Sequence, residues 1–537
     1  MTSTIRYQGD NIIYQPKLPL DQTFSYEESV PKDDISRTVR EAVEGANIIK
    51  YVNFAKRKSY GHDPVRMLEA VLMAFATRGC ASLREMEELC RFDFRYRFIM
   101  DGATPSHMAF QRFIRDDLKL PIGEIFKELN LWIAGNDEVD EGILYVDGSK
   151  WEANANKYTF VWKRSTAKYR GKLWAKAMGG LMKLNRKMEE EGIRCRFSIL
   201  KDPSMGYLGE VAGTLESLMA SMGIEKEAGK GHRKHWLQKA QEYFEEAAKK
   251  MAKYAEYISI CGNRNSFSKT DPDATFMHMK YDYYCHTNVF KPGYNVQMGV
   301  CSRYIWHLYV SPDANDVKTL IPFLEGYEKA YGGMPEAVVA DAGYGSYDNY
   351  SYLDGKGIAA YVKYPMQRKK SGKISKEDRF KKYAFAKDGE GRYVCPAGHA
   401  FEPVSERVDE RGIYPKLNET CATGKCEGCA LRSKCTKSAA GRKITVCRKQ
   451  DEYEEMADAL VRSEEGAKLM AQRSIQCEGV FGNIKEDNGY GRLRRRGKTG
   501  VTEEIYLVAM GHNLRRYHAA KTAKMKMEAA KAAGLKS

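Results

Sequence analysis

Three acidic residues stand in sequence contexts where a protein can use carboxylates for metal chemistry. Asp147 ends the apolar run of GILYVDGS, Asp341 ends that of EAVVADAGYGS, and Glu478 lies in CEGVFGNIKEDNGYG. Strand ends beside glycine-rich turns are where α/β sheets gather site residues, so we expect the two aspartates to meet. Carboxylate oxygens are the ligands that Mg²⁺ prefers, and a pair of such ions can drive phosphodiester chemistry. Clustered carboxylates repel one another without a cation, so their convergence predicts a metal site.

Glu478 is predicted to lie on an amphipathic helix. At 100° per residue, Glu478 falls at the rim of an apolar arc, and Lys485 lies within about 40° of it. A lone glutamate in such a place is more often an ordinary surface residue, so the prediction of a site depends on the two aspartates. The arc predicted to face a core consists of Val480, Ile484, Cys477 and Phe481.

A basic segment follows this helix at once. GRLRRRG places four arginines within five residues, and the whole chain carries 87 Lys and Arg against 71 Asp and Glu, a net charge of +16. An isolated basic turn is often only a solvated surface, but beside a phosphodiester site it is suited to holding backbone phosphates. We therefore expect DNA contacts from Arg492, Arg494, Arg495 and Arg496.

Cysteines cluster between residues 395 and 435. Cys426 and Cys429 have the two-residue gap typical of zinc knuckles, and Cys435 and Cys395 complete a tentative Zn²⁺ ligand set. His399 and Cys421 are possible substitutes, and free thiols or an iron-sulfur cluster are the alternatives. A four-thiolate site has no open coordination position, so we expect a structural role.

The N-terminal part contains several helix-start signals at the spacing of a small helical module. Asp63 with Pro64, Ser82 with Glu85, and Thr104 with Pro105 each predict a helix start. Three short helices suit DNA binding of the helix-turn-helix kind, although such helices occur in proteins of every function. If this module binds DNA, the contacts are expected from Gln111, Arg112 and Arg115 of the third helix.

The remaining patterns predict an α/β protein with a mixed sheet flanked by helices. Strand-like GYNVQMGVC and YIWHLYVS stand between the two aspartates, and Tyr294, Asn295 and Gln297 in the first of them are possible substrate contacts. The expected divisions are an extended arm at 1–45, the helical DNA-binding module at 46–135, a catalytic domain at 140–159, 266–365 and 451–517, a helical insertion at 160–265, a cysteine-rich, zinc-ribbon-like insertion at 366–450, and a basic tail at 518–537.

These motifs, in this order, resemble the DDE transposases of bacterial insertion sequences. GHDPVRMLEAVLMAFATRGCASLREMEELCRFD is similar to the N-terminal helical domain of the InsH-like group, and VDGSKWEANANKY, TDPDATFM, KPGYNVQ, ADAGYGS and RSIQCEGVFGNIKEDNGYGRLRRRG are similar to its further motifs. The resemblance implies a ribonuclease H-like catalytic domain.

It also implies that Asp147, Asp341 and Glu478 hold two Mg²⁺ or Mn²⁺ ions, with Asp147 shared between them. One ion would activate water and later the freed 3′-hydroxyl, and the other would stabilise the leaving oxygen. Lys485 would contact a phosphate near the scissile bond, and the cysteine cluster is similar to cysteine motifs at this place in related transposases.

The chain departs from the family pattern in one turn of the helix. The family has an arginine four residues before the glutamate and a tyrosine three residues before that arginine, whereas this chain has Ser474 and Ala471 there. Arg473 stands one position away from the expected arginine, so its contact with DNA is an open prediction.

The expected function is a DNA transposase that cuts at the terminal inverted repeats of its element and transfers the 3′ ends to target DNA. The partners would be double-stranded DNA and a second copy of the chain. A nuclease or domesticated DNA-binding descendant on the same fold is the first alternative. A zinc-dependent DNA-binding regulator is the second, and it predicts that the three acids lie far apart.

The start MTSTIRYQGDN has no secretory pattern, which predicts a cytoplasmic, nucleoid-associated protein.

Overall fold

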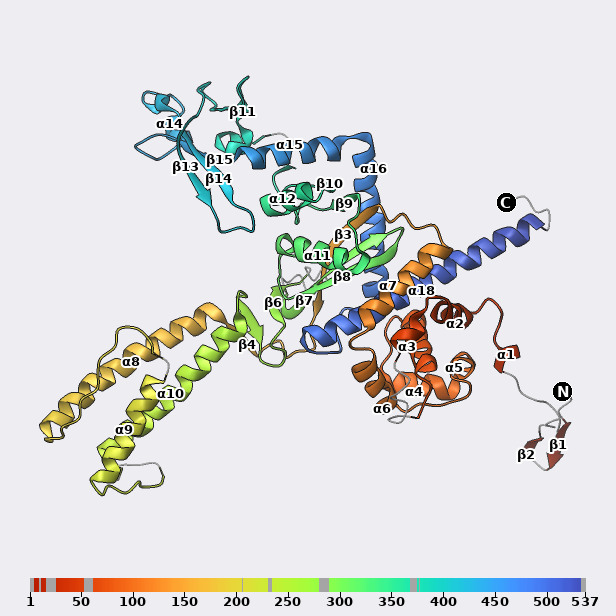
Figure 1. Ribbon diagram of the computed structural model, residues 1–537, viewed down its shortest axis with the longest axis horizontal. Helices are drawn as coiled ribbons and strands as arrows, with labels where there is room; N and C mark the ends of the chain where they lie inside the picture. Colours follow the sequence, from red (N-terminus) through yellow and green to blue (C-terminus); the bar gives the residue numbers. More distant parts are fainter. Residues whose placement is uncertain are drawn as a thin grey trace. The chain divides into compact units, whose positions relative to one another are not determined.

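A computed structural model of the chain describes residues 4–8, 11–15, 26–52, 61–204, 206–229, 234–279, 289–367, 374–375 and 377–532 (Figure 1). The chain divides into two units, one made of residues 1–139 and 506–537 and the other of residues 140–505. None of the helices in the described ranges is both long enough and apolar enough to cross a membrane.

The first unit is helical apart from a hairpin of β1 (Thr4–Gln8) and β2 (Asn11–Gln15). Asp63 and Ser82 cap their helices as predicted, and Ser82 forms a capping box with Glu85. The third predicted helix is capped by Ser106 instead of Thr104. The helices are α1 (Tyr26–Ser29), α2 (Ile35–Gly45), η1 (Ile48–Tyr51), α3 (Pro64–Arg78), α4 (Leu83–Phe92), α5 (Phe94–Ile99), α6 (His107–Arg112), the π-helical turn η3 (Phe113–Asp117), α7 (Ile122–Asn136) and the part of α18 (Gly497–Ala532) from residue 506 on.

One expectation about the chain ends differs from the structure, and the other gains detail. The end of the expected arm 1–45 is helix α2, because Asp34 caps it and Val39, Ala42 and Val43 form a buried helical stripe. The expected basic tail at 518–537 continues α18 as far as Ala532. Residues 1–3, 9–10 and 16–25 of the arm and 533–537 of the tail lie outside the described residues.

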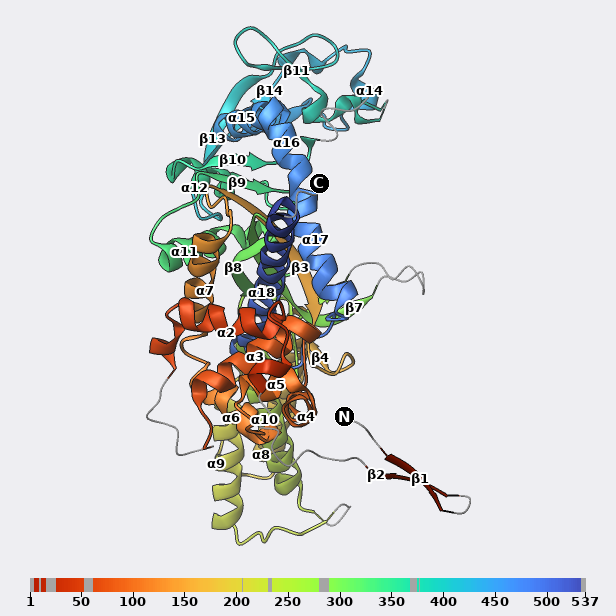
Figure 2. The same ribbon diagram turned by 90° about the vertical axis from the view of Figure 1, so that its right-hand side faces the viewer.

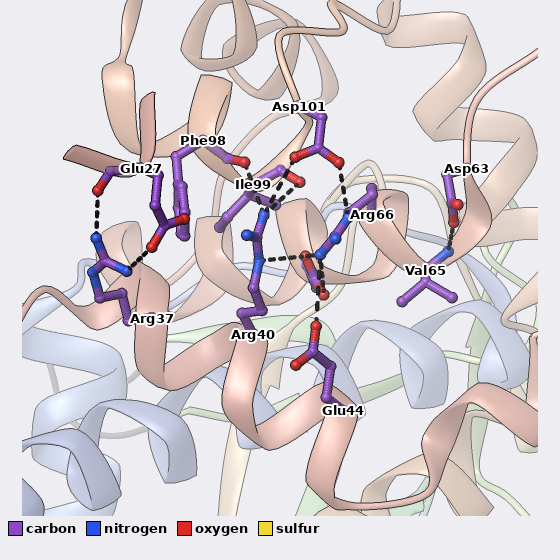
Figure 3. A network of polar contacts seen from close by, with 11 residues as sticks. Glu27, Arg37, Arg40, Glu44, Asp63, Val65, Arg66, Phe98, Ile99 and Asp101 are labelled. Carbon is purple, nitrogen blue, oxygen red and sulfur yellow. Dashed lines mark hydrogen bonds and ion pairs between the residues drawn. The ribbon is translucent and has the colours of Figure 1, made fainter. Parts of the chain in front are cut away.

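A buried ion-pair network holds α2, α3 and the end of α5 together (Figure 3). The fully buried Glu69 of α3 pairs with Arg66 at 2.9 Å and with Arg40 of α2 at 3.8 Å. Both arginines also pair with Asp101, and the Arg40 guanidinium lies 4.0 Å from the centre of the Phe98 ring. Burial raises the pKa of Glu69 to about 6. The network therefore places a carboxylate in the core only because two cations accompany it.

The second unit is built on a mixed sheet with the strand order β10-β9-β3-β7-β6, in which β8 also pairs with β7. Strands β10, β9 and β3 run parallel, whereas β7 is antiparallel to β3, β6 and β8. The fold is therefore of the mixed α/β class, as predicted. The strands are β3 (Ile143–Glu152), β6 (Thr275–His278), β7 (Phe290–Cys301), β8 (Tyr304–Ser311), β9 (Ala337–Ala340) and β10 (Ala359–Val362).

Helices lie against both faces of this sheet. Leu144 faces Phe323 of α11, whereas Ser149 and Trp151, whose side chains point to the other face, contact the helical run 464–487. Figure 2 shows this run beside β3 and β7. The helices are η4 (Asp316–Lys318), α11 (Leu320–Tyr331), α12 (Tyr347–Gly355), α15 (Arg448–Arg462), α16 (Glu464–Arg473), η8 (Ser474–Glu478), α17 (Gly479–Gly482) and η9 (Asn483–Asp487).

Two further groups of elements interrupt the sheet in sequence. One contains β4 (Phe160–Trp162), α8 (Lys163–Glu190), α9 (Tyr207–Ser221), α10 (Trp236–Cys261) and β5 (Ser266–Ser268), and its helices share a core that includes Phe244, Ala247 and Met251 of α10. The other contains η5 (Asp378–Phe380), η6 (Lys382–Ala384), β11 (Ala386–Lys387), β12 (Tyr393–Val394), β13 (Glu402–Asp409), β14 (Lys416–Ala422), η7 (Gly424–Cys426), α14 (Arg432–Cys435) and β15 (Lys443–Val446).

Candidate active site

Asp147 and Asp341 follow the last paired residues of two neighbouring parallel strands. The parallel pairing of β3 with β9 ends at Val146 opposite Ala340, so each aspartate is the next residue along its chain. Adjacent strands lie about 4.8 Å apart, which brings the two carboxylates to one place. Asp147 does not end its strand as predicted, because β3 continues to Glu152 against the antiparallel partner β7.

The Asp147 carboxylate is held in a poorly solvated place. Its side chain is 19% exposed, and its Oδ1 accepts a 2.9 Å hydrogen bond from the Gly148 amide. Burial raises its pKa to about 6, against the opposing effect of Arg473, and the charges of Asp341 and Asp316 add to the rise. The Asp341 Oδ1 accepts a 2.7 Å hydrogen bond from the amide of Gly343. A cation beside Asp147 would relieve the cost of its charge.

Glu478 is joined to Asp147 through Arg473. One guanidinium nitrogen lies 3.3 Å from Asp147 Oδ2 and the other lies 3.6 Å from Glu478 Oε1. Ser474, which occupies the arginine position of the family pattern, donates a 3.3 Å hydrogen bond to the same Glu478 oxygen. The Glu478 side chain is 63% exposed, so it can change its orientation at little cost.

A π-helical turn explains why the displaced arginine reaches the site. In a regular α-helix, side chains five residues apart point about 140° away from each other. Residues 474–478 instead form the π-helical turn η8, whose hydrogen bonds span five residues, so Arg473 and Glu478 come to the same side. The sequence prediction placed residues at 100° intervals, as in a regular α-helix, and so could not show that Arg473 and Glu478 share one side. Its buried arc of Cys477, Val480, Phe481 and Ile484 agrees with the structure.

Lys485 contacts β3. Its ammonium donates hydrogen bonds of 2.6 Å to Ser149 Oγ and 2.7 Å to the Lys150 carbonyl, and it lies 4.0 Å from the centre of the Trp151 ring. A second π-helical turn, η9, contains Lys485, so the angle between Lys485 and Glu478 again differs from the one expected at 100° per residue. Lys485 lines a cleft of about 630 Å³ with Gly148, Ser149, Lys150, Glu152, His278, Met279, Lys291, Glu486, Gly489 and Gly491.

Asp316 is a further carboxylate near the two aspartates that was not predicted. Its Oδ1 accepts hydrogen bonds from Asn295 at 2.7 Å and from Gln297 at 2.9 Å. Both amides are buried, so they do not lie at the surface as substrate contacts would. The hydroxyl of Tyr344 donates to Gln297 Oε1 and thereby links this group to the turn after Asp341. The only sequence signal was a polar loop after a buried strand, which also contains Asp313.

The carboxylates of Asp147, Asp341 and Glu478 are the type of ligand that a divalent cation prefers, but their side chains are not arranged around a common point. Within the described residues, no group of three His, Cys, Asp or Glu side chains is placed so that it could hold a metal ion. The positive charge between Asp147 and Glu478 is instead the Arg473 guanidinium. A regulator without chemistry was expected to have its three acids far apart. The contacts through Arg473 show instead that Asp147 and Glu478 lie close together.

The arginine segment after η9 is fixed to the end of β3. The Leu493 amide donates a 2.8 Å hydrogen bond to the Glu152 carbonyl, and Arg492 lies 3.6 Å from the Glu152 carboxylate. Arg495 pairs at 2.6 Å with the buried Glu503, so it is a structural partner. Arg492, Arg494 and Arg496 are exposed.

Four cysteines line one small cavity in the region of β11 to β15. The cavity of about 20 Å³ is bordered by Cys395, Cys426, Cys429 and Cys435, together with His399. The Arg442 amide donates a 3.4 Å hydrogen bond to Cys426 Sγ. The four thiols are therefore neighbours, although the arrangement is not that of a metal site. Cys421 is buried with Phe385 and Phe401 in an apolar core and does not line this cavity.

The predicted DNA contacts of the helical unit lie on α6 and the turn after it. Gln111 and Arg112 are half-buried, and Arg112 donates a 3.3 Å hydrogen bond to the Met108 carbonyl. Arg115 is exposed and pairs with the adjacent Asp116 at 2.8 Å. Arg115 is thus the most accessible of the three.

Comparison with known families gives two matches. Residues 394–518 match the family described as Transposase DDE domain, and residues 24–116 match Transposase domain (DUF772). The first range includes Glu478, Lys485 and the arginine segment, whereas Asp147 and Asp341 lie outside both ranges. No curated protein and no solved structure matches the chain. The two family matches confirm the resemblance stated from the motifs, because both are to transposase families and they are consistent with a DDE transposase of an insertion sequence.

Proposed function

We propose that the chain is a DNA transposase that cleaves at the terminal inverted repeats of its element and transfers the 3′ ends to target DNA. The observation that carries the proposal is the position of Asp147 and Asp341 on adjacent parallel strands, with Glu478 linked to them through Arg473. The strand order β8-β7-β3-β9-β10, antiparallel in its first part and parallel in its second, supports a ribonuclease H-like catalytic domain.

Asp147, Asp341 and Glu478 would hold the divalent cations. Mg²⁺ or Mn²⁺ bound there would supply activation of an attacking oxygen and stabilisation of the leaving one. Asp147 gains from a cation, because burial raises the pKa of its carboxyl and so makes its charge costly. Glu478 is exposed and can turn inward, which would release Arg473 to hold a phosphate oxygen.

DNA would lie along the cleft beside the carboxylates. Lys485 lines this cleft and is held in place by Ser149, so its charge is positioned before DNA arrives. The exposed Arg492, Arg494 and Arg496 extend the same end of β3 and would hold phosphates without reading sequence. The helical unit with Gln111, Arg112 and Arg115 would add contacts to the element ends, and a homodimer would bring two ends together.

The cysteine cluster is proposed to hold structural Zn²⁺. The shared cavity of Cys395, Cys426, Cys429 and Cys435 supports this assignment, because it brings together four residues of the type that tetrahedral Zn²⁺ sites use. Metal analysis of the purified protein tests it: one zinc per chain is expected, and purified protein with four reactive thiols here and no metal would contradict it.

Strand transfer with purified protein tests the main proposal. The substrate is labelled DNA that carries the flanking inverted repeats, incubated with Mg²⁺ and a target plasmid. Nicked and joined products are expected from the wild type and not from Asp147→Asn or Glu478→Gln, while Asp202→Asn, at an exposed site in the helical insertion, serves as the control. Activity that survives Asp147→Asn would refute the mechanism, and nicking without joining would favour the nuclease alternative.

A further inference from the structure

Asp316 has a carboxylate whose two oxygens face different surroundings. Oδ1 accepts both amide hydrogen bonds, from Asn295 and Gln297 of β7. Oδ2 has no hydrogen-bond partner among the described residues. Neither η4 nor α11 has a side-chain cap in the described chain, so the Asp316 carboxylate does not cap either helix. An asparagine would accept the same two hydrogen bonds without adding charge to an acidic site, so the negative charge requires another reason.

The position of Asp316 is marked by two glycines, one beside each of the other aspartates. A Cβ atom on Gly148 would come within 2.5 Å of Asp316 Oδ1, so only glycine at this position of β3 leaves room for the carboxylate. A Cβ atom on Gly343 would lie 2.9 Å from Asp341 Oδ1 and 3.6 Å from Asp316 Oδ2. Because both distances are measured from the same Cβ position on Gly343, Asp341 Oδ1 and Asp316 Oδ2 lie no more than about 6.5 Å apart.

This separation suits carboxylates that serve the same cation site. Mg²⁺ binds oxygen at about 2.1 Å, and paired ions lie about 4 Å apart, so ligand oxygens several ångströms apart can belong to one site. The Gln297 amide that holds Asp316 is itself held by the Tyr344 hydroxyl, three residues after Asp341. The Asp316 carboxylate is therefore oriented before any ion binds, and the turn that carries Asp341 is part of the same network.

We propose that Asp316 is a fourth carboxylate of the divalent-cation site, held by Asn295 and Gln297 so that its Oδ2 faces the cation bound by Asp147 and Asp341. The inference rests on the proposed function, because it assumes that a cation binds there. It assigns Asn295 and Gln297 to the support of the site, where the sequence suggested substrate contacts. It also explains why the loop after β8 presents a charged side chain to two other acids.

Mn²⁺ binding to the full chain without DNA, measured by calorimetry, tests the proposal. Asp316→Asn keeps the shape of the side chain and is expected to weaken binding about 10- to 100-fold, as loss of a supporting group does at metal sites. Asp313→Asn, a charge-matched change in the same loop, is expected to bind as the wild type does. In EDTA, the unfolding midpoint of Asp316→Asn should equal or exceed that of the wild type, because the change removes repulsion between acids.

Each outcome separates this inference from the proposed function. If the wild type binds Mn²⁺, Asp147→Asn does not, and Asp316→Asn binds as the wild type does, the role of Asp316 is refuted while the proposed function stands. If Asp316→Asn lowers the midpoint in EDTA, its role is structural and the inference also fails. If the wild type itself binds no Mn²⁺, the proposed metal chemistry and this inference fall together.

Discussion

Replacing Asp147 by asparagine should stabilise the metal-free protein at neutral pH while it abolishes catalysis. The pKa of Asp147 is raised from 3.8 to about 6, chiefly by burial. A shift of that size corresponds to about 3 kcal/mol of folding free energy, at 1.36 kcal/mol per pKa unit. The wild type bears this cost whenever the carboxylate is ionised, and Asp147→Asn does not, so the variant should be more stable at pH 7.5 by an amount of that order.

The pH dependence has a defined sign. Because the folded pKa is raised, the folded state binds the proton more tightly than the unfolded state does. The favourable contribution of the protonated carboxyl is complete below about pH 3.8 and is lost as the pH rises through about 6. The advantage of Asp147→Asn should therefore be absent near pH 3.5 and should grow between about pH 4 and 6.

Thermal and urea unfolding in EDTA between pH 3.5 and 8 provide the assay, with Asp202→Asn as an exposed control. Mn²⁺ at about 1,000 times its Kd should reverse the order, because it adds about 4.1 kcal/mol to the wild type alone, which exceeds the advantage of the variant. A variant that is less stable than the wild type in EDTA at pH 7.5, or a difference that does not change with pH, would refute the reasoning.

Four other predictions concern the helix, the arginine segment and the cysteines. Exchanging Arg473 and Ser474, which restores the family spacing, should reduce nicking by about 10- to 100-fold, since charged hydrogen bonds contribute about 1.5–3 kcal/mol and the π-helical turn favours position 473; nicking at the wild-type rate would contradict this. Arg494→Ala should reduce the magnitude of the slope of log K against log salt by about 0.9, and an unchanged slope would exclude its phosphate contact. Arg495→Ala should instead destabilise the fold by roughly 1.5–3 kcal/mol, because the buried Glu503 loses its 2.6 Å charged hydrogen bond from Arg495, and a midpoint equal to that of the wild type would refute the structural role. Cys429→Ser should lower bound zinc below one per chain and lower the unfolding midpoint, and a wild type that contains no zinc would remove the basis for this expectation.

The sequence by itself determined the features that depend on neighbouring residues. The caps at Asp63 and Ser82 follow from local hydrogen bonding, and the structure contains both. The apolar run before Asp341 is strand β9, because a short β-rich run with a glycine turn after it has few other solutions. The buried arc opposite Glu478 was also predicted, since four apolar side chains at helical spacing must face a core.

Only the tertiary structure decided how these elements meet. Asp147 lies within β3 because β7 continues to pair with β3 after Asp147. No local sequence pattern predicts a strand partner about 150 residues away. Arg473 reaches the site through a π-helical turn, which depends on packing against the sheet and not on helix propensity. Asp316 differs from Asp313 only in which of them meets Asn295 and Gln297 after folding. A carboxylate acquires its function from the charges and amides that long-range contacts bring to it, and residue spacing does not contain that information.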